Sequence, residues 1–261
     1  VIPFVDKNYR TSSIRTLFGH SLAGAFTLNY LASAPGVFDN YIAASPVVQI
    51  MNSELIKKFS SFFKKHPKLK KSVYFTLTEA NAESMVVFNA MNAFVDMYKK
   101  EAPKSLRWKY DFIENQVHMT TPYLTIYKGL NEVFYDYQTP TFKSYQDYVN
   151  KGGMKGLKKY FSKRAQKYNT SSVITDNTLR MLADVLYRDQ QEKLAEELLI
   201  LNTKNHPNSM GALNSLARFY IRLKKIDKAK ETYKKIIVLT EKQGSPNTAY
   251  FKRQLDRLEK N

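Results

Sequence analysis

The sequence predicts an α/β fold built on a parallel sheet over residues 1–137, followed by an all-α region. Three observations predict this division. Short apolar segments alternate with segments of helical periodicity in the first half of the 261-residue chain, which is the pattern of strands joined by crossover helices. Thr139-Pro140 then breaks the last helix of that half. Beyond this break the periodic segments are helical, and an apolar pattern recurs after thirty-four residues, as in stacked helix pairs.

The composition limits the class of protein. The chain is long enough for one large domain or two smaller ones. It has no cysteine, which excludes a thiol nucleophile, a disulfide framework and a cysteine metal site, and we expect no metal and no cofactor. The formal net charge is +18, yet the basic residues are dispersed. The densest run, residues 57–71, interleaves lysine with phenylalanine at helical spacing, so we expect a solvated helix face and no nucleic-acid partner.

The sequence shows no sign of a membrane segment. No apolar run approaches the roughly 18 residues that a spanning helix requires. Residues 1–6 lack the basic and apolar regions of a signal peptide. We therefore expect no transmembrane segment, and the compartment stays open between cytoplasm and periplasm.

The elements of the first half follow from local patterns. Compact runs rich in β-branched and aromatic residues predict strands, and apolar residues on one face at helical spacing predict helices. In chain order these are a strand at 14–18, a helix at 22–34, a strand at 41–46, a helix at 53–65, a strand at 73–78, a helix at 84–99, a strand at 106–113 and a helix at 120–135. Because single helices separate the strands, the four strands should pair in parallel through right-handed crossovers.

The first strand-to-helix turn, residues 19–24, has the sequence GHSLAG. Small residues on both sides of Ser21 allow the strand and helix backbones to approach while the hydroxyl projects, which is the geometry of a nucleophile elbow. Ala23 departs from the G-x-S-x-G pattern, because it stands where the second glycine is expected. The alternative interpretation is an ordinary turn in which Ser21 caps the helix.

Polar residues follow the ends of two later strands. Ligands and catalytic groups of a parallel sheet gather beyond the carboxyl ends of its strands, where the sequence places Glu79 and Glu83 after the third strand and His118 after the fourth. The order nucleophile, acid, histidine is that of Ser-His-acid hydrolases. We interpret Ser21 as the nucleophile and His118 as the base.

The identity of the acid is left open by the sequence. We prefer Glu83 slightly over Glu79, and a Ser-His pair without an acid is a third option. Ordinary interpretations also exist, with Glu79 as a strand-end surface charge and Glu83 as a first-turn carboxylate favoured by the helix dipole. The other histidines suit the base less well: His20 should point away from Ser21 across the strand, and the remaining two lie in loops at 66 and 206.

Several stretches resemble a known family. They are LFGHSLAG at 17–24, APGVFDNYIAASP at 34–46, HMTTP at 118–122 and YKGL at 127–130. Together they are similar to the esterase family that includes enterochelin esterases, esterase D and feruloyl esterases. The resemblance implies an α/β-hydrolase fold over residues 1–137 and cleavage of a carboxylic ester through an acyl-enzyme. It also implies that Ser21 is the nucleophile, that His118 acts as base and then acid, and that the Leu22 backbone N–H is an oxyanion-hole donor.

The beginning of the chain departs from that family. A complete α/β-hydrolase places several strands, and the loop with the second oxyanion donor, before the elbow, whereas 20 residues precede Ser21 here. We therefore expect only the C-terminal part of the hydrolase sheet, with the N-terminal strands missing. An open strand edge invites pairing with another chain. Since losing one oxyanion donor costs on the order of 100- to 1,000-fold in rate, we expect weak or no hydrolysis of a p-nitrophenyl ester by this chain alone.

The second half contains an internal repeat. A linker over residues 138–175 includes a predicted connecting helix at 156–167, and helical repeats occupy 176–261. Leu179, Leu182, Ala183, Leu186, Ala195 and Leu199 recur as Leu213, Leu216, Ala217, Tyr220, Ala229 and Tyr233. This pattern is similar to the tetratricopeptide repeat, and residues 247–260 supply a helix suited to capping the stack. Two repeats are fewer than an independent solenoid usually needs.

Two functions from different classes fit these observations. The first is a serine esterase, for which a basic surface suits an acidic small-molecule ester such as a catecholate. The second is a non-catalytic interaction or scaffold protein that uses the helical repeats on a degenerate hydrolase domain. The repeats themselves are interpreted either as a docking surface for a protein or peptide partner or as a packing appendage.

Overall fold

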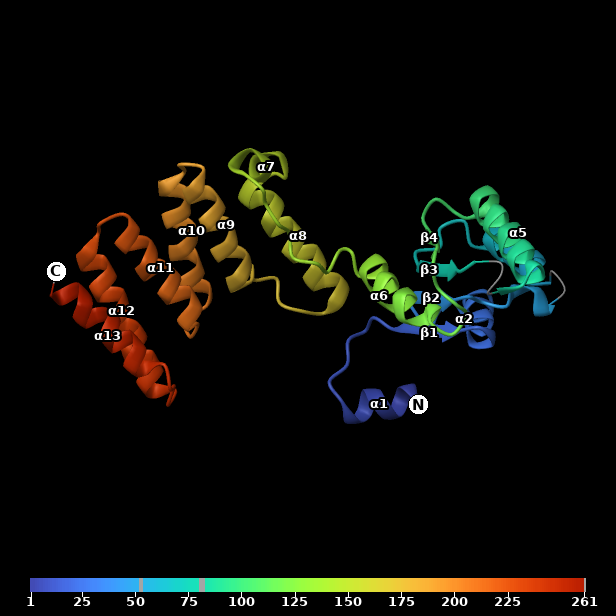
Figure 1. Ribbon diagram of the computed structural model, residues 1–261, viewed down its shortest axis with the longest axis horizontal. Helices are drawn as coiled ribbons and strands as arrows, with labels where there is room; N and C mark the ends of the chain where they lie inside the picture. The colour runs from blue at the N-terminus through green and yellow to red at the C-terminus, as the bar shows by residue number, and fades with distance from the viewer. Residues whose placement is uncertain (52–53, 80–82, 261) are drawn as a thin grey trace. The chain divides into compact units, whose positions relative to one another are not determined.

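The computed structural model describes residues 1–51, 54–79 and 83–260 (Figure 1). It divides the chain into two compact units, Val1–Gln138 and Thr139–Asn261. The expected start of a helix at Ser53, the loop residues 80–82 and the expected last repeat residue, Asn261, lie outside the described residues. Within the described part of the chain, no helix has the length and apolar character that crossing a membrane requires.

The first unit is built on a parallel sheet, as predicted. Its strands are β1 (Thr16–His20), β2 (Asn40–Ala44), β3 (Ser72–Leu77) and β4 (Arg107–Phe112), and they lie in the order β1-β2-β3-β4. All three pairings are parallel, with Thr16 opposite Asn40 and Asn40 opposite Ser72. Because the strands are parallel and lie in chain order, their carboxyl ends meet at one edge of the sheet.

Helices cover both faces of this sheet. The helices of the first unit are α1 (Ile2–Asn8), α2 (Leu22–Ser33), η1 (Val48–Met51), α3 (Glu54–Lys65), α5 (Met85–Glu101) and α6 (Thr121–Val133). On one face, buried side chains of α2, α3 and α5 pack against Tyr41 and Phe75, whereas α6 lies on the opposite face against Ile42 and Tyr74. Successive strand residues point to opposite faces, so neighbours such as Tyr41 and Ile42 pack against helices on different faces of the sheet.

The lysine-rich segment forms the outer side of α3. Phe59, Phe62 and Phe63 are buried in the core, and the Phe59 ring lies 5.3 Å from that of Phe94 in an edge-on arrangement. Lys64 and the lysines beside it face solvent. The interpretation of a solvated basic helix face is therefore correct for this segment.

The second unit is entirely helical within its described residues. Its helices are α7 (Tyr145–Asn150), α8 (Gly153–Tyr168), α9 (Asp176–Arg188), α10 (Glu192–Asn205), α11 (Met210–Arg222), α12 (Ile226–Lys242) and α13 (Thr248–Glu259). Each helix from α9 to α13 packs against the next one along the chain. Helices α11 and α12 begin 34 residues after α9 and α10, so the sequence repeat is also a structural repeat. Its assignment to the tetratricopeptide class stays a prediction.

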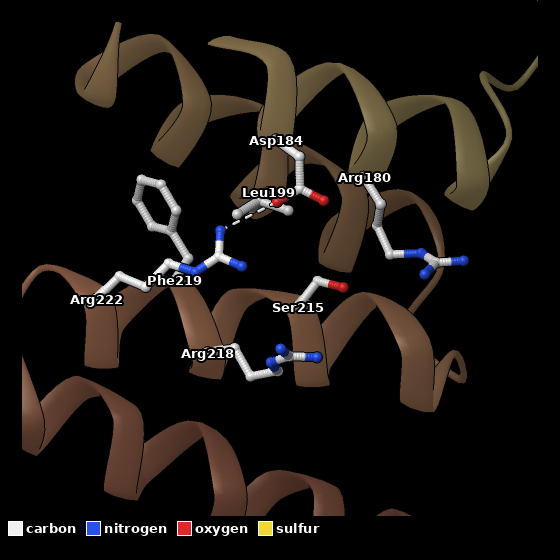
Figure 2. A pocket seen from close by; sticks show the side chains of 7 residues that line it. All are labelled: Arg180, Asp184, Leu199, Ser215, Arg218, Phe219 and Arg222. Atoms are coloured by element: carbon white, nitrogen blue, oxygen red, sulfur yellow. Dashed lines mark hydrogen bonds and ion pairs between the residues drawn. The ribbon is translucent and has the colours of Figure 1, made fainter. Parts of the chain in front are cut away.

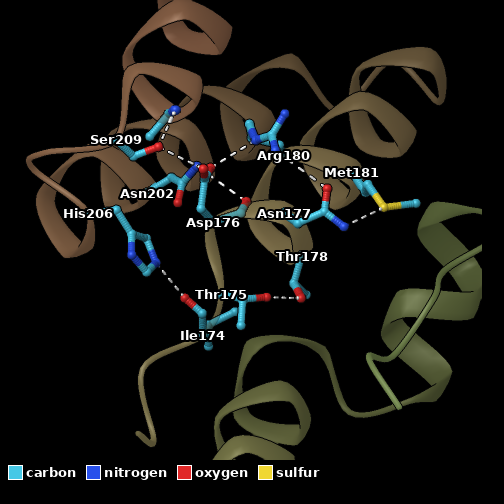
Figure 3. Close-up of polar contacts among 11 residues, drawn as sticks. Ile174, Thr175, Asp176, Asn177, Thr178, Arg180, Met181, Asn202, His206 and Ser209 are labelled. Carbon is cyan, nitrogen blue, oxygen red and sulfur yellow. Dashed lines mark hydrogen bonds and ion pairs between the residues drawn. The ribbon is translucent and has the colours of Figure 1, made fainter. Parts of the chain in front are cut away.

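A polar cluster joins the start of α9 to the end of α10 (Figure 3). Asp176 Oδ1 accepts hydrogen bonds from Arg180 Nε at 2.9 Å and Asn202 Nδ2 at 2.7 Å. Its Oδ2 accepts one from Ser209 Oγ at 2.7 Å. Ser209 in turn caps α11 by accepting from the backbone N–H of Ala212. One carboxylate thus links the beginnings of α9 and α11 with the last turn of α10.

Some elements differ from the sequence prediction. Helix α1, the short α7 and the 3₁₀ turn η1 were not expected from the pattern, and the predicted helix at 156–167 begins earlier, at Gly153. The first strand spans Thr16–His20 instead of 14–18. It runs up to Ser21 itself, which leaves no spacer between the strand and the turn.

Candidate active site

Ser21 occupies a strained corner between β1 and α2. Its backbone has φ 58° and ψ −118°, a conformation that L-residues other than glycine rarely adopt and that costs of order 1–3 kcal/mol. The Ser21 N–H donates to the Ala44 carbonyl at 2.9 Å, which ties the corner to the end of β2. Ser21 makes no side-chain capping hydrogen bond to α2. Ser21 thus occupies the N-cap position of α2, but its hydroxyl does not cap the helix.

Two glycines make this corner possible. A Cβ on Gly19 would lie 2.1 Å from the Ala23 carbonyl oxygen, far inside contact distance. A Cβ on Gly24 would lie 3.1 Å from both the Ala44 oxygen and Pro46 Cβ. Only glycine therefore fits at position 19, where α2 crosses β1. At position 24, where α2 crosses β2, a larger residue would require its neighbours to shift. Ala23, the position that departs from the family pattern, is exposed and has room for its methyl group.

Glu83 and His118 form a hydrogen-bonded pair. Glu83 Oε2 lies 2.7 Å from His118 Nδ1. The Glu83 side chain is almost completely buried, with 2% of its surface exposed, whereas 28% of the His118 side chain is exposed. Because a carboxylate only accepts, His118 Nδ1–H is the donor in this contact, and Nε2 takes no part in it. The arrangement is that of a buried acid orienting an accessible imidazole.

Glu79 has a different position. Its Oε1 accepts the backbone N–H of Asn115 at 2.9 Å, and Asn115 takes a left-handed conformation with φ 57°, which asparagine tolerates better than most residues. The neighbouring Thr78 hydroxyl lies 2.9 Å from the Ile113 carbonyl and 2.8 Å from that of Gln116. The end of β3 thus holds the loop that carries His118, and the structure pairs Glu83, not Glu79, with the imidazole.

His20 is a neighbour of His118. Its Nε2–H donates to the His118 carbonyl oxygen at 3.0 Å, and the two ring centroids are 4.5 Å apart. Burial, followed by the proximity of His118, lowers the pKa of His20. From the sequence we expected His20 to point away from Ser21, and the structure places its ring against that of His118. Its side chain fixes the backbone at His118 immediately beside the Ser21 corner.

Leu22 is the first residue of α2. The first N–H groups of a helix have no acceptor within the helix, and the helix dipole favours negative charge there. The Leu22 N–H is one of these groups. The Leu22 side chain is 62% exposed, so it does not cover this end of the helix.

The structure brings some of the predicted site residues into direct contact and others not. The structure joins Glu83 to His118, and it brings the His118 ring against His20, the residue that precedes Ser21. No hydrogen bond between Ser21 and His118 is formed among the described residues. Within the same residues, no group of three or more histidine, aspartate or glutamate side chains could hold a metal ion. The arrangement can supply a nucleophile, a base with its acid, and one N–H donor.

Comparisons with known proteins find matches to the first part of the chain. A family described as "Putative esterase" matches residues 1–83. Ferri-bacillibactin esterase BesA of Bacillus subtilis (strain 168) is 38% identical over 61 residues, which are 23% of this chain and 21% of that protein. The chain thus spans about a fifth of the curated relative that it matches.

Solved structures share the fold. An IroE-like serine hydrolase from Shewanella oneidensis has a TM-score of 0.56 and 17% identity, over 78% of this chain and 63% of its own. An uncharacterised protein from Capnocytophaga ochracea DSM 7271 has a TM-score of 0.60 and 14% identity, over 100% of this chain and 72% of its own. Residues 1–83 therefore match the esterase family, and the chain shares its fold with a serine hydrolase.

Proposed function

We propose that the first unit is a serine hydrolase of the α/β-hydrolase superfamily that cleaves a carboxylic ester. The observation that carries the proposal is the hydrogen bond between Glu83 Oε2 and His118 Nδ1, on a loop held beside the strained corner at Ser21. In this proposal Ser21 is the nucleophile, His118 the base and Glu83 the acid that orients the imidazole. The match of residues 1–83 to the esterase family supports it.

The first chemical step forms an acyl-enzyme. His118 Nε2 takes the proton of the Ser21 hydroxyl as Oγ attacks the carbonyl carbon of the ester. The Leu22 N–H donates to the oxyanion that forms, and Glu83 stabilises the imidazolium. His118 Nε2 then gives its proton to the alcohol oxygen, and the carbon–oxygen bond of the ester breaks.

The second step returns the enzyme to its starting state. Water gives a proton to His118 Nε2 as its oxygen attacks the acyl carbon, and the proton then passes to Ser21 Oγ as the carboxylic acid leaves. Ester and water become acid and alcohol, and no cofactor takes part. A buried acid suits this cycle, because the charge of Glu83 faces the imidazolium without competition from water.

The proposed substrate is an anionic ester of the siderophore type. Two observations support this class: the similarity to a protein named ferri-bacillibactin esterase and the net charge of +18, which draws an acidic ester toward the protein.

For the second unit we propose two tetratricopeptide-type repeats, since helices recur with a 34-residue offset and equivalent alanines, Ala183 and Ala217, are buried.

A fluorophosphonate probe tests the proposed function. Labelling requires a single attack by Ser21 and no turnover, so it can be detected even where ester hydrolysis is weak. We expect slow labelling of the chain and loss of the label in the Ser21→Ala variant. Ser33→Ala is the matched control, because Ser33 is an exposed serine at the end of the same helix. Absence of labelling in the unmodified chain would favour the alternative, a scaffold protein whose hydrolase unit has no catalytic role.

A further inference from the structure

The carbonyl group of His118 takes its hydrogen bond from His20. In a helical turn each carbonyl accepts from the N–H four residues later, and the Val117 carbonyl accepts from the Thr121 N–H at 3.1 Å in this way. The corresponding donor for His118 does not exist, because residue 122 is proline and has no N–H. His20 Nε2 lies 3.0 Å from this carbonyl oxygen. The imidazole of His20 thus supplies the hydrogen bond that Pro122 cannot.

The His118 imidazole is held from two sides. Glu83 Oε2 lies 2.7 Å from Nδ1, and a single hydrogen bond of this kind fixes the position of one ring nitrogen but not the plane of the ring. The His20 ring lies against the His118 ring, with 4.5 Å between the centroids and 42° between the planes. The carboxylate and the neighbouring ring together therefore define both the position and the plane of the His118 imidazole.

The sheet holds His20 itself in place. His20 is the last residue of β1 and lies opposite Ala44 of β2 in the register. The next residue, Ser21, donates its N–H to the Ala44 carbonyl at 2.9 Å. Side chains on strands are placed more precisely than those on loops, and His118 lies on the loop before α6. Because one peptide bond joins His20 to Ser21, a contact from His20 couples the position of His118 to that of the serine.

The proton of His20 lies on the nitrogen that this contact requires. A carbonyl oxygen only accepts, so Nε2 carries the hydrogen. Burial, followed by the proximity of His118, lowers the pKa of His20, so its ring is neutral at pH 7. A neutral ring adds no positive charge beside the imidazolium that His118 forms in the proposed reaction. The charge of Glu83, which also acts on the His20 ring, is then left to stabilise that imidazolium.

We propose that His20 is a positioning residue, which holds the His118 imidazole in one orientation beside Ser21 through the carbonyl hydrogen bond and the ring contact. His20 neither takes the proton of Ser21 nor touches the ester. Its effect on reactivity rests on the proposed function, in which His118 is the base. Its effect on the orientation of the His118 ring does not, and that orientation is measurable without any reaction.

NMR of the histidine ring nitrogens tests the orientation on the full chain. The chain has four histidines, so selective ¹⁵N labelling gives four side chains to observe, and His118→Ala assigns the signals of His118. We expect the same sharp His118 signals in the unmodified chain and in His20→Gln, because a glutamine amide can still donate to the carbonyl. In His20→Ala both contacts are lost, and the His118 signals should shift and broaden. Unchanged His118 signals in His20→Ala would overturn the proposal.

The rate of fluorophosphonate labelling of Ser21 tests the consequence for reactivity. His20→Gln keeps the donor and should stay close to the rate of the unmodified chain. His20→Phe keeps a ring but loses the donor, and should label about tenfold more slowly, as expected for the loss of one hydrogen bond. His20→Ala loses both contacts and should label about 100-fold more slowly, since a displacement of about 1 Å in a catalytic group has an effect of that size.

Two control variants separate this role from general effects of substitution. His66→Gln replaces another imidazole of the same unit, whose Nδ1 lies 2.9 Å from the Phe62 carbonyl oxygen. Arg222→Gln breaks an ion pair of the helical unit, in which Arg222 Nη1 lies 3.1 Å from Asp184 Oδ1 (Figure 2). Both variants should leave the His118 signals and the labelling rate unchanged. Far-UV circular dichroism confirms that each variant keeps its secondary structure.

The outcomes distinguish the positioning role from the proposed function. Labelling of His20→Ala as fast as the unmodified chain, or equal losses in His20→Ala and His66→Gln, would overturn the positioning role while the reaction of Ser21 stands. A Ser21 that never reacts in the unmodified chain would refute the proposed function. The His118 signals in His20→Ala then decide the positioning role by themselves.

Discussion

Glu83 Oε2 lies 2.7 Å from His118 Nδ1, while Glu79, four residues earlier, accepts the backbone N–H of Asn115 at 2.9 Å. The two glutamates that follow β3 thus contact the same loop in different ways. One contacts the imidazole and the other contacts the backbone that carries it. This division makes their substitution a sharp test of which carboxylate orients His118.

We predict that Glu83→Gln lowers the rate of fluorophosphonate labelling by up to about 10⁴-fold, because a glutamine no longer stabilises the imidazolium. Glu79→Gln should have a much smaller effect, since a neutral amide oxygen still accepts the Asn115 N–H. Time courses of labelling for the two variants measure the difference. Equal losses in both would contradict the assignment of Glu83 as the acid.

The glycine before the elbow gives a prediction about stability. Gly19→Ala should lower the free energy of unfolding by several kcal/mol, because the added Cβ would lie 2.1 Å from the Ala23 oxygen. Gly36→Ala is the control, since no atom lies within 4 Å of a Cβ at Gly36. Urea unfolding followed by the fluorescence of Trp108, the single tryptophan of the chain, measures both. A Gly19→Ala variant as stable as Gly36→Ala would show that the corner is looser than described.

Much of the first unit could be predicted from the sequence because its signals are local. Alternation of strand and helix patterns indicates parallel pairing, and the strand ends at Ser21, Glu83 and His118 then fall at one edge of the sheet. The choice between Glu79 and Glu83 could not be made, because it depends on the path of the chain after β3. Sequence distance from the strand end does not reveal which carboxylate turns inward.

His20 shows a second limit of sequence reasoning. His20 and Phe18 share one face of β1 by strand alternation, and Phe18 lies opposite Ile42 in the register. Ile42 packs on the face that α6 covers, and His118 lies just before α6. Alternation therefore places His20 on the side of His118 once the face of α6 is known. That face is a property of tertiary packing, which the local pattern does not contain.

The His20 environment predicts a pH dependence of stability. Burial, and to a smaller extent the electrostatic effect of nearby His118, lower the pKa of His20 from its ordinary value of 6.5. The unfolded chain therefore binds a proton at His20 more readily than the folded chain does. The resulting stability is fully present above pH 6.5 and is lost as the pH falls toward the lowered value. We predict that His20→Gln loses less stability than the unmodified chain between pH 7 and pH 5. Urea titrations at both pH values, followed by Trp108, measure this; identical losses would contradict it.

Asp176 gives a prediction for the helical unit. Burial opposes ionisation of Asp176, but hydrogen bonds from Asn202 and Ser209 and the charge of Arg180 outweigh it and lower its pKa. We predict that Asp176→Asn destabilises the unit by about 1–2 kcal/mol at pH 7. The effect is no larger because solvent screens part of the ion pair between Asp176 and Arg180.

The difference between Asp176→Asn and the unmodified chain should begin to shrink as the pH falls through 3.8, where the unfolded carboxylate takes up its proton, and should vanish below the lowered pKa of the folded chain, where the carboxylate is protonated in both states. Urea unfolding followed by circular dichroism at the helix band measures this. Asp184→Asn is the control, since Asp184 is largely exposed and its loss should change stability by less than about 0.5 kcal/mol. Equal destabilisation by both variants would show that the cluster at Asp176 has no special role.

The central claim is that His118 activates Ser21. Mass spectrometry of the chain after treatment with a fluorophosphonate, resolved to the peptide that contains Ser21, tests it most directly. The account predicts an adduct on Ser21 in the unmodified chain and in His66→Ala, and none in His118→Ala. An adduct that forms equally well without the His118 imidazole, or a Ser21 that never reacts, would contradict it.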